Sequence, residues 1–201
     1  MMEHKDPLKE YRAKRNFRRS PEPSGRRKKK PGKQAIFVIQ KHPVARNLHY
    51  DLRLEVDGVL KSWAVPKGPS TDPREKRAAF ATEDHPLEYA EFEGVIPEGE
   101  HGSGTIMVWD LGTYRNLTEK NKKIVPINQA LEKGHANVWL NAQKVKGGYS
   151  LTRIAKGKKE RWQLVKMKDE KADARRNPLR SEPDSALTRR SLKQIEKDES
   201  E

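Results

Sequence analysis

Hydrophobic and polar residues alternate with a period of two in several short segments of the chain. Every second residue from Leu48 to Val56 is hydrophobic, and the residues between them are polar. Alternation of this kind is typical of a strand with one buried and one polar face. Asp57-Gly58 follows directly and is a two-residue turn signal, so 59–65 is expected to pair back on 48–56 as an antiparallel hairpin.

Further short strands are expected along the middle of the chain, separated by Gly and Pro. They are 36–40, 77–84, 105–110, 135–140, 144–146, 149–154 and 161–167. Gly147-Gly148 is expected to form a turn, and only 127–133 has a helical pattern in this region, with a second short helix possible near the C-terminus. Many short strands joined by Gly and Pro turns predict a mainly β fold, a small antiparallel β-barrel with one or two short helices.

Charge is distributed unevenly along the 201 residues, which carry a formal net charge of +14. Residues 1–34 contain 13 basic and 4 acidic side chains, and 169–201 are polar. We therefore expect a basic N-terminal arm (1–34), a β-barrel domain (35–168) and a polar C-terminal tail (169–201). Both tails are expected to be disordered, because such segments cannot bury a core of their own.

The composition also excludes some classes of protein. The chain has no cysteine, which excludes disulfides and Cys-ligated metal sites. No hydrophobic run approaches the roughly 20 residues of a membrane span, and the N-terminus begins with charges, so a cytoplasmic protein without a membrane partner is expected. The basic excess suits contacts with nucleic-acid phosphates.

Candidate metal ligands occur in the motif HPVARNLHYDLR. His49, Asp51 and Arg53 are two residues apart and project from the same face of one strand. His42 precedes a proline that keeps it extended, so a short loop can place it beside His49. Two imidazoles and one carboxylate suit a divalent cation such as manganese or zinc, with coordination positions left open. Arg53 would lie near the open side, where a guanidinium can bind phosphate oxygens.

A second strand, KRAAFATEDHP, is expected to repeat this geometry. Arg77, Glu83 and His85 are an even number of residues apart, so we expect them to share one face. If this face and that of His49 both point into one mouth of the barrel, Tyr89 joins them in a pocket suited to phosphoryl chemistry. The alternative is that these alternating polar residues are only the solvated side of an antiparallel sheet.

The remaining histidines and the tryptophans show no comparable pattern. Residues interpreted as structural or surface are His4, His101 and His135, and those interpreted as packing are Trp63, Trp109, Trp139 and Trp162. Lys67 is either a turn residue or a phosphate contact.

The sequence resembles a known enzyme family over about residues 8–168. The runs FVIQKH, LHYDLRLEVDGVLKSWAVPKGPS and EDHPLEYAEFEGVIPEGEHGSGTIMVWD closely resemble the 3′-phosphoesterase module of bacterial DNA ligase D and its stand-alone archaeal and bacterial relatives. The resemblance implies a small β-barrel and a manganese-dependent activity at the 3′ end of a DNA primer strand. It implies removal of a terminal ribonucleoside and then of the remaining 3′-phosphate, leaving a 3′-hydroxyl.

The resemblance also assigns roles to matching positions. The implied metal ligands are His42, His49 and Asp51, and the implied catalytic groups that hold the scissile phosphate are Arg53, His85 and Tyr89. Further matches are Lys67, Arg77 and Glu83, together with Arg15 and Glu22 of an N-terminal motif associated with nucleoside removal. Asn16 departs from the acidic residue usual in that motif, which weakens the expectation of phosphodiesterase activity more than that of phosphomonoesterase activity.

Cofactor and partners follow from the same resemblance. Mn²⁺ is the implied metal, with Zn²⁺ or Co²⁺ as possible substitutes, and DNA with a 3′-terminal ribonucleotide or 3′-phosphate is the implied substrate. Separate DNA ligase, primase-polymerase and Ku-like end-binding proteins are plausible partners in a prokaryotic, nucleoid-associated setting. Two alternatives stay open: a barrel that binds nucleic acid without turnover, and an iron oxygenase with His49, Asp51 and His85 as ligands.

Overall fold

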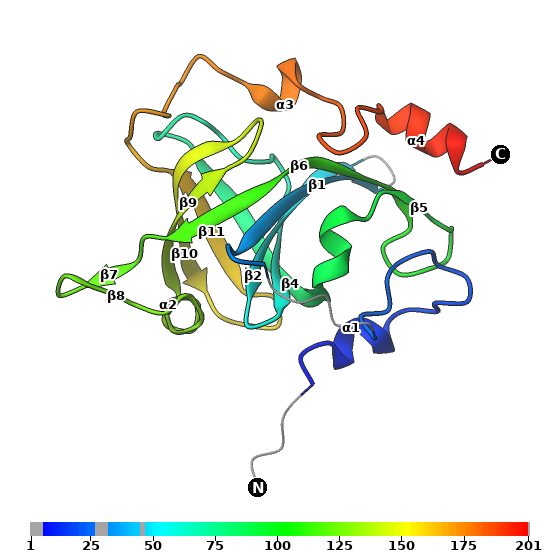
Figure 1. The fold of residues 1–201 in the computed structure, drawn as a ribbon, viewed down its shortest axis with the longest axis horizontal. Coiled ribbons are helices and arrows are strands. Elements are labelled where there is room, and N and C mark those ends of the chain that lie inside the picture. Colours follow the sequence, from blue (N-terminus) through cyan, green and yellow to red (C-terminus); the bar gives the residue numbers. More distant parts are fainter. Residues whose placement is uncertain (1–5, 27–31, 45–46, 201) are drawn as a thin grey trace, which may run out of the picture.

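The computed structural model describes residues 6–26, 32–44 and 47–200, and its main feature is a closed antiparallel β-barrel. Eight strands follow each other around the barrel in the order β1-β2-β3-β4-β11-β10-β9-β6, and β6 pairs with β1 to close it (Figure 1). Their bounds are β1 Ile36–Val44, β2 Asn47–Val56, β3 Val59–Val65, β4 Lys76–Pro86, β6 Gly104–Asn116, β9 His135–Asn141, β10 Lys146–Ala155 and β11 Arg161–Lys166. The predicted fold class is confirmed.

Short elements surround the barrel. The remaining strands are β5 Gly94–Ile96, β7 Glu119–Lys120 and β8 Lys123–Ile124, and the helices are α1 Lys9–Ala13, α2 Ile127–Lys133, α3 Pro178–Ser181, α4 Leu192–Asp198 and the 3₁₀-helix η1 Leu87–Glu91. The helix predicted over 127–133 is confirmed as α2, which ends where Gly134 takes a left-handed φ of 88°. Each helix in the described part of the chain is too short or too polar to span a lipid bilayer.

Two hydrophobic clusters lie on opposite sides of the barrel wall. The inner cluster draws on all eight barrel strands and includes Leu52 and Trp109. The outer cluster joins β1, β3 and β6 to η1 and the N-terminal segment, and includes Tyr11 and Val38. Because Val38 lies opposite Arg53 in the β1–β2 register, the polar face of β2 is the outer face. Arg53 is 3% exposed, so this face is covered by the outer elements and is not a solvated surface.

A β-bulge in β4 changes which residues share a face. Leu60 and Ser62 of β3 are separated by one residue, whereas their partners in β4, His85 and Thr82, are separated by two. Arg77 therefore lies opposite Leu164 of the inner cluster, whereas His85 lies opposite Leu60 of the outer cluster. The prediction that Arg77 and His85 share a face is wrong, because one extra residue reverses the alternation of side chains beyond it.

The predicted turn at Gly147-Gly148 is also wrong, since both glycines lie inside β10 and the chain turns at 142–145. A Cβ on Gly147 would lie 2.8 Å from Lys166 Nζ, and one on Gly148 would lie 2.8 Å from Met167 Sδ. These positions need glycine because the chain after β11 packs directly against them.

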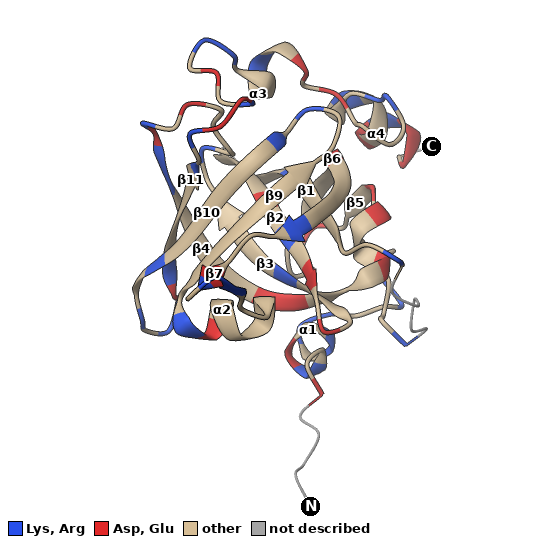
Figure 2. Cartoon of the chain, turned by 60° about the vertical axis from the view of Figure 1, so that its left-hand side comes forward, with Lys and Arg blue, Asp and Glu red and all other residues tan. Residues whose placement is uncertain are grey.

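The described parts of both tails pack on the barrel, so the expectation of disordered tails is wrong for these residues. Tyr11 and Ile195 are both 0% exposed, and the indole of Trp109 donates to the Glu182 carbonyl at 2.8 Å. Helices α1 and α4 each contain both basic and acidic residues (Figure 2). A few buried side chains thus anchor segments whose overall composition is polar. The basic run at 27–31 lies outside the described residues.

Candidate functional site

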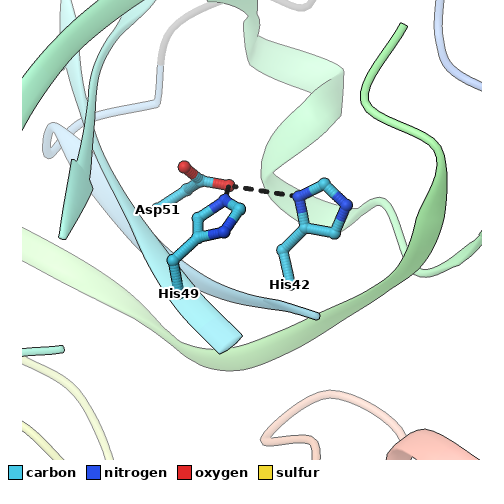
Figure 3. A group of neighbouring side chains, drawn as sticks. All are labelled: His42, His49 and Asp51. Atoms are coloured by element: carbon cyan, nitrogen blue, oxygen red, sulfur yellow. Dashed lines mark ion pairs between the residues drawn. The ribbon is translucent and has the colours of Figure 1, made fainter. Parts of the chain in front are cut away.

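Three side chains that can ligate a metal converge near the ends of β1 and β2. His42 lies opposite His49 in the β1–β2 register, and Asp51 is the next residue on the same face of β2. Asp51 Oδ2 lies 3.5 Å from His49 Nε2 and 3.9 Å from His42 Nδ1 (Figure 3). One possible ligand atom from each of the three residues lies within 4.8 Å of the other two. The predicted proximity of these residues is confirmed.

The protonation states of this group suit a divalent cation. Burial lowers the pKa of His42 to about 4, so its imidazole is neutral at neutral pH and keeps a lone pair for a metal. Burial acts to raise the pKa of Asp51, but Arg53 and the hydrogen bond from His49 hold it below its ordinary value. Neutral imidazoles and an ionised carboxylate are the ligand states that Mn²⁺ and Zn²⁺ require. The cluster could therefore hold a divalent metal.

Arg53 connects the metal-ligand group to a second cluster around His85. Its Nη2 lies 3.4 Å from Asp51 Oδ2, and its Nη1 lies 3.1 Å from His85 Nδ1. Arg53 Nε donates to Gln40 Oε1 at 2.7 Å. His85 is therefore separated from Asp51 by a guanidinium, and it does not join the group of possible ligands found among the described residues.

The N-terminal segment supplies the other side of the His85 cluster. Arg15 Nη2 lies 3.3 Å from His85 Nε2, so His85 lies between two guanidiniums. Arg15 is held in place by ion pairs to Glu22 at 2.9 Å and to Glu83 at 3.0 Å. Burial, Arg53 and Arg15 all lower the pKa of His85 well below its usual value. The imidazole is therefore neutral, and its Nδ1 lies 2.9 Å from the Glu83 carbonyl as well as beside Arg53.

Tyr89 belongs to the same cluster. Its hydroxyl donates to Glu22 Oε1 at 2.9 Å, and its ring lies edge-on to His85 with centroids 4.7 Å apart. Burial and Glu22 raise the pKa of Tyr89 well above its ordinary value, so the hydroxyl keeps its proton. The structure thus brings together five residues singled out from sequence: Arg15, Glu22, Arg53, His85 and Tyr89.

Sequence reasoning missed two residues that hold the cluster together. Gln40 is fully buried, and its amide nitrogen donates to the carbonyls of Tyr89 and Phe92, so it links Arg53 to η1. Tyr11 packs its ring under the Arg15 guanidinium, 3.9 Å from Cζ to the centroid, and lies edge-on to His85. Gln40 is in phase with His42 on β1, which was an available signal, but the contacts of Tyr11 depend on tertiary packing alone.

Other predicted residues lie apart from this cluster. Lys67 is exposed in the loop after β3, and Arg77 faces the inner side of β4 and pairs with Glu75. The expectation that the polar faces meet inside a barrel mouth is wrong, because the cluster lies on the outer face of the wall. Lys67 and Arg77 therefore have no contact with His85 in the described part of the chain.

The remaining histidines and tryptophans mostly match their expected roles. His135 is exposed and contacts Thr152, whereas His101 Nε2 lies 3.4 Å from Glu83 Oε1 at the edge of the site, a contact the sequence did not predict. Three tryptophans are confirmed as inner-core residues, namely Trp63, Trp109 and Trp162. His4 lies outside the described residues.

The fold and the site define a β-barrel protein with a candidate divalent-metal centre beside a buried cluster of arginine, histidine and tyrosine. The family model described as the DNA ligase D 3′-phosphoesterase domain matches residues 40–153. The chain is 47% identical over 190 residues to the multifunctional non-homologous end joining protein LigD of Pseudomonas aeruginosa, and 45% identical over 167 residues to its namesake in Mycolicibacterium smegmatis. The chain belongs to the DNA ligase D 3′-phosphoesterase domain family.

These relatives are much longer than this chain. The match covers 92% of the chain but 22% of the Pseudomonas protein, and 83% of the chain but 21% of the Mycolicibacterium protein. The chain therefore spans about a fifth of the length of the curated relatives that it matches. The similarity concerns the phosphoesterase part of those proteins only.

Proposed function

We propose that this chain is a metal-dependent DNA 3′-phosphoesterase that acts in end-joining repair. It would remove a 3′-terminal ribonucleoside and then a 3′-phosphate to leave a 3′-hydroxyl. The observation that carries the proposal is the shared outer face on which His42, His49 and Asp51 adjoin the Arg53–His85–Arg15 cluster. A site for a divalent cation next to two buried guanidiniums suits a phosphate group.

His42, His49 and Asp51 would hold the metal, with Mn²⁺ as the first choice and Zn²⁺ or Co²⁺ as substitutes. Bound there, the metal would act as a Lewis acid on the phosphate and could activate water. Arg53 and Arg15 would bind the phosphate oxygens, because their planar guanidiniums match that geometry and are already fixed by Gln40, Glu22 and Glu83.

His85 is suited to proton transfer once phosphate is bound. In the free protein, burial and the two arginines keep the pKa of His85 low and the ring neutral. A phosphate between the arginines would offset their positive charge and favour protonation of the imidazole. We therefore propose His85 as the proton donor to the leaving oxygen. Tyr89 would orient His85 through the contact between their rings, and the hydroxyl of Tyr89 is itself held by Glu22.

The N-terminal segment offers space for the nucleoside that leaves in the first step. An open cavity of about 610 Å³ is lined by Arg15, Asn16, Phe17, Arg18, Ser24 and Arg26. Asn16 Oδ1 accepts the backbone N–H of Arg18 at 3.1 Å, a role that an aspartate would also fill. The departure at Asn16 is therefore compatible with the local fold, and its consequence would be chemical, since an amide cannot act as a base.

The proposed substrate is DNA carrying a 3′-phosphate or a single 3′-ribonucleotide. The process that presents this substrate would be repair by end joining, the role that the LigD relatives carry in their names. Separate ligase, polymerase and end-binding proteins would act before or after this chain.

A 5′-labelled duplex primer with a 3′-phosphate tests the proposal. We expect Mn²⁺ to support conversion to the slower-migrating 3′-hydroxyl product on a denaturing gel, and chelation to stop it. His135→Ala, an exposed histidine away from the site, is the matched control for His49→Ala. A retarded duplex with an unchanged primer would indicate binding without turnover, and a requirement for 2-oxoglutarate would indicate the oxygenase alternative.

A further inference from the structure

The loop between β5 and β6, residues 97–103, contacts both parts of the site. Where the loop enters β6, Gly104 packs against the metal-ligand group, since a Cβ added there would lie 3.4 Å from His42 Nε2. Farther back, Glu100 pairs with Arg19 of the N-terminal segment at 3.1 Å, so the loop lies beside that segment (Figure 1). The part of the loop between these two contacts therefore crosses from the metal ligands to the N-terminal segment.

His101 lies in this middle part of the loop and reaches the ion pair that fixes Arg15. Its Nε2 lies 3.4 Å from Glu83 Oε1, the oxygen that also pairs with Arg15 Nη1 at 3.0 Å. Burial, Arg53 and Arg15 are the main causes of the low pKa of His85. His101 adds to their effect, which places the two imidazoles near each other. The His101 side chain is 45% exposed, so its ring is accessible to a bound substrate.

Removal of a ribonucleoside and removal of a phosphate break bonds to two different oxygens. In the first reaction the bond from phosphorus to O5′ of the terminal ribonucleoside breaks, and in the second the bond to O3′ of the DNA strand breaks. Each oxygen leaves as a strongly basic alkoxide unless a general acid gives it a proton. His85 is 4% exposed and is held between Arg53 and Arg15 at 3.1 and 3.3 Å. One fixed imidazole can align with one of these two corners of the phosphate, so the other reaction needs a second acid.

The cavity proposed for the leaving nucleoside has no such acid among its lining residues. These residues are Arg15, Asn16, Phe17, Arg18, Ser24 and Arg26. None of these side-chain types exchanges a proton near neutral pH, whereas histidine is suited to that exchange. His101 adjoins this side of the site through Glu83, whose carboxylate contacts both His101 and Arg15. Together with the path of its loop, this contact places His101 between the cavity and the metal-ligand group, where the bond to O5′ would break.

We propose that His101 is the general acid for removal of the ribonucleoside, with Glu83 orienting its ring, and that His85 serves removal of the phosphate. This assignment rests on the proposed phosphoesterase function and divides its two steps between two histidines. In the first step, the oxygen of a water molecule bonds to phosphorus as the bond to O5′ breaks. O5′ keeps the electron pair of that bond and takes the proton of His101, while the water loses a proton to solvent, from which His101 is protonated again. The products are a free ribonucleoside and a strand with a 3′-phosphate.

His101→Gln tests this role, because glutamine can donate a hydrogen bond to Glu83 but cannot give up a proton. Rates are measured with Mn²⁺ on two 5′-labelled duplex primers, one ending in a 3′-ribonucleoside and one in a 3′-phosphate. We expect ribonucleoside removal to fall by about two to four powers of ten, the range for a lost proton-transfer group, and phosphate removal to fall at most a few-fold. His135→Gln changes an exposed histidine away from the site, and as the matched control it should equal the wild type on both primers.

A third primer separates proton donation from a structural role. Its 3′-phosphate is esterified with p-nitrophenol, whose anion is a weak base and leaves without a proton. We expect His101→Gln to cleave this primer within a few-fold of the wild-type rate, because the proton that His101 supplies is no longer needed.

Unchanged ribonucleoside removal in His101→Gln would overturn the proposal, as would an equal loss on all three primers, which would make His101 a structural residue. A loss on the nitrophenyl primer as large as on the ribonucleoside primer would also overturn it, because His101 would then position the leaving group without protonating it. A wild type that removes the 3′-phosphate but no ribonucleoside would overturn it too. A wild type that acts on neither of these primers would instead contradict the proposed function, so the two failures are distinguishable.

Discussion

Arg53 contacts both parts of the site, the metal-ligand group and the His85 cluster. It contacts Asp51 on one side and His85 on the other, and Gln40 fixes its Nε. The guanidinium lowers the pKa of Asp51 against the effect of burial, and it adds to the effect of burial in lowering the pKa of His85. Its position explains why His85 is expected to act on phosphate and not to ligate a metal.

Replacing one metal ligand should abolish metal binding without unfolding the barrel. We expect His49→Ala to lower Mn²⁺ affinity by about a hundredfold or more, since loss of even an outer contact to a ligand costs about 10- to 100-fold. Calorimetric titration of Mn²⁺ measures this, with circular dichroism as the check on folding. His135→Ala should match the wild type, and unchanged affinity in His49→Ala would remove His49 from the ligand set.

Replacing His85 should separate catalysis from metal binding. We expect His85→Ala to keep nearly normal Mn²⁺ affinity while the rate falls by about two to four powers of ten, the range for a lost proton-transfer group. Arg53→Lys should also be damaging, because a lysine cannot form the guanidinium fork. A loss of Mn²⁺ binding in His85→Ala as severe as in His49→Ala would make His85 a ligand.

Asn16 should set the balance between the two proposed activities. Because Asn16 Oδ1 only accepts the N–H of Arg18, Asn16→Asp keeps that contact and adds a carboxylate at the cavity next to Arg15. We expect nucleoside removal to rise relative to phosphate removal, measured on primers with a 3′-ribonucleotide and with a 3′-phosphate. An unchanged ratio would separate Asn16 from the nucleoside step.

At the scale of elements, the N-terminal segment is part of the site. Residues 6–26 contribute Arg15 and Glu22, and Glu83 of β4 holds the segment through Arg15 and Lys14. Burial acts to raise the pKa of Glu83, but backbone hydrogen bonding and Arg15 lower it to about 2. The segment therefore depends on a buried carboxylate that stays ionised at all physiological pH values.

Glu83→Gln should loosen this segment and leave the barrel intact. We expect faster amide hydrogen exchange within 6–26, by an amount equivalent to about 1–3 kcal/mol for a lost charged hydrogen bond, with no change in β9 to β11. Glu10→Gln is the matched control, because Glu10 pairs with Lys14 at the surface. Exchange that accelerates equally in both regions would contradict a local role for Glu83.

The strands and turns also show which features of the fold and site the sequence alone could predict. The alternation at 48–56 and the Asp57-Gly58 turn predicted the strand and hairpin that carry Asp51 and Arg53, and the phase of His49 predicted the metal-ligand cluster. The alternation of hydrophobic and polar residues gives no sign of the bulge in β4, so the prediction that Arg77 and His85 share one face was wrong. The packing of Tyr11 against His85 joins residues far apart in the chain, and no local pattern encodes it.

At the scale of the whole molecule, the buried histidines couple folding to pH. The pKa of His42 is about 4 in the folded protein, below the ordinary value near 6.5. Its contribution to stability is therefore complete above pH 6.5 and is lost as pH falls toward 4. The pKa of His85 is lowered in the same direction, whereas the contribution of Glu83, whose pKa is about 2, is complete above about pH 4.5 and is lost only as pH falls below that value.

Urea unfolding of metal-free protein at several pH values measures this coupling. Between pH 7 and pH 4, the loss of unfolding free energy should be smaller in His42→Gln than in the wild type by up to about 3 kcal/mol. Burial raises the pKa values of Asp84 and Asp110, so these residues also make stability depend on pH. Because both proteins contain them, the difference between the two proteins reports on His42. Parallel curves for the two proteins would contradict a buried, neutral His42.

We propose that the outer face of β1, β2 and β4 holds metal and phosphate side by side. Crystals grown with Mn²⁺ and inorganic phosphate, measured at the manganese absorption edge, test it most directly. We expect an anomalous peak among His42, His49 and Asp51, with phosphate bonded to Arg53 and His85. A manganese peak elsewhere, or phosphate bound by Lys67 and Arg77 on the other side of the wall, would contradict it.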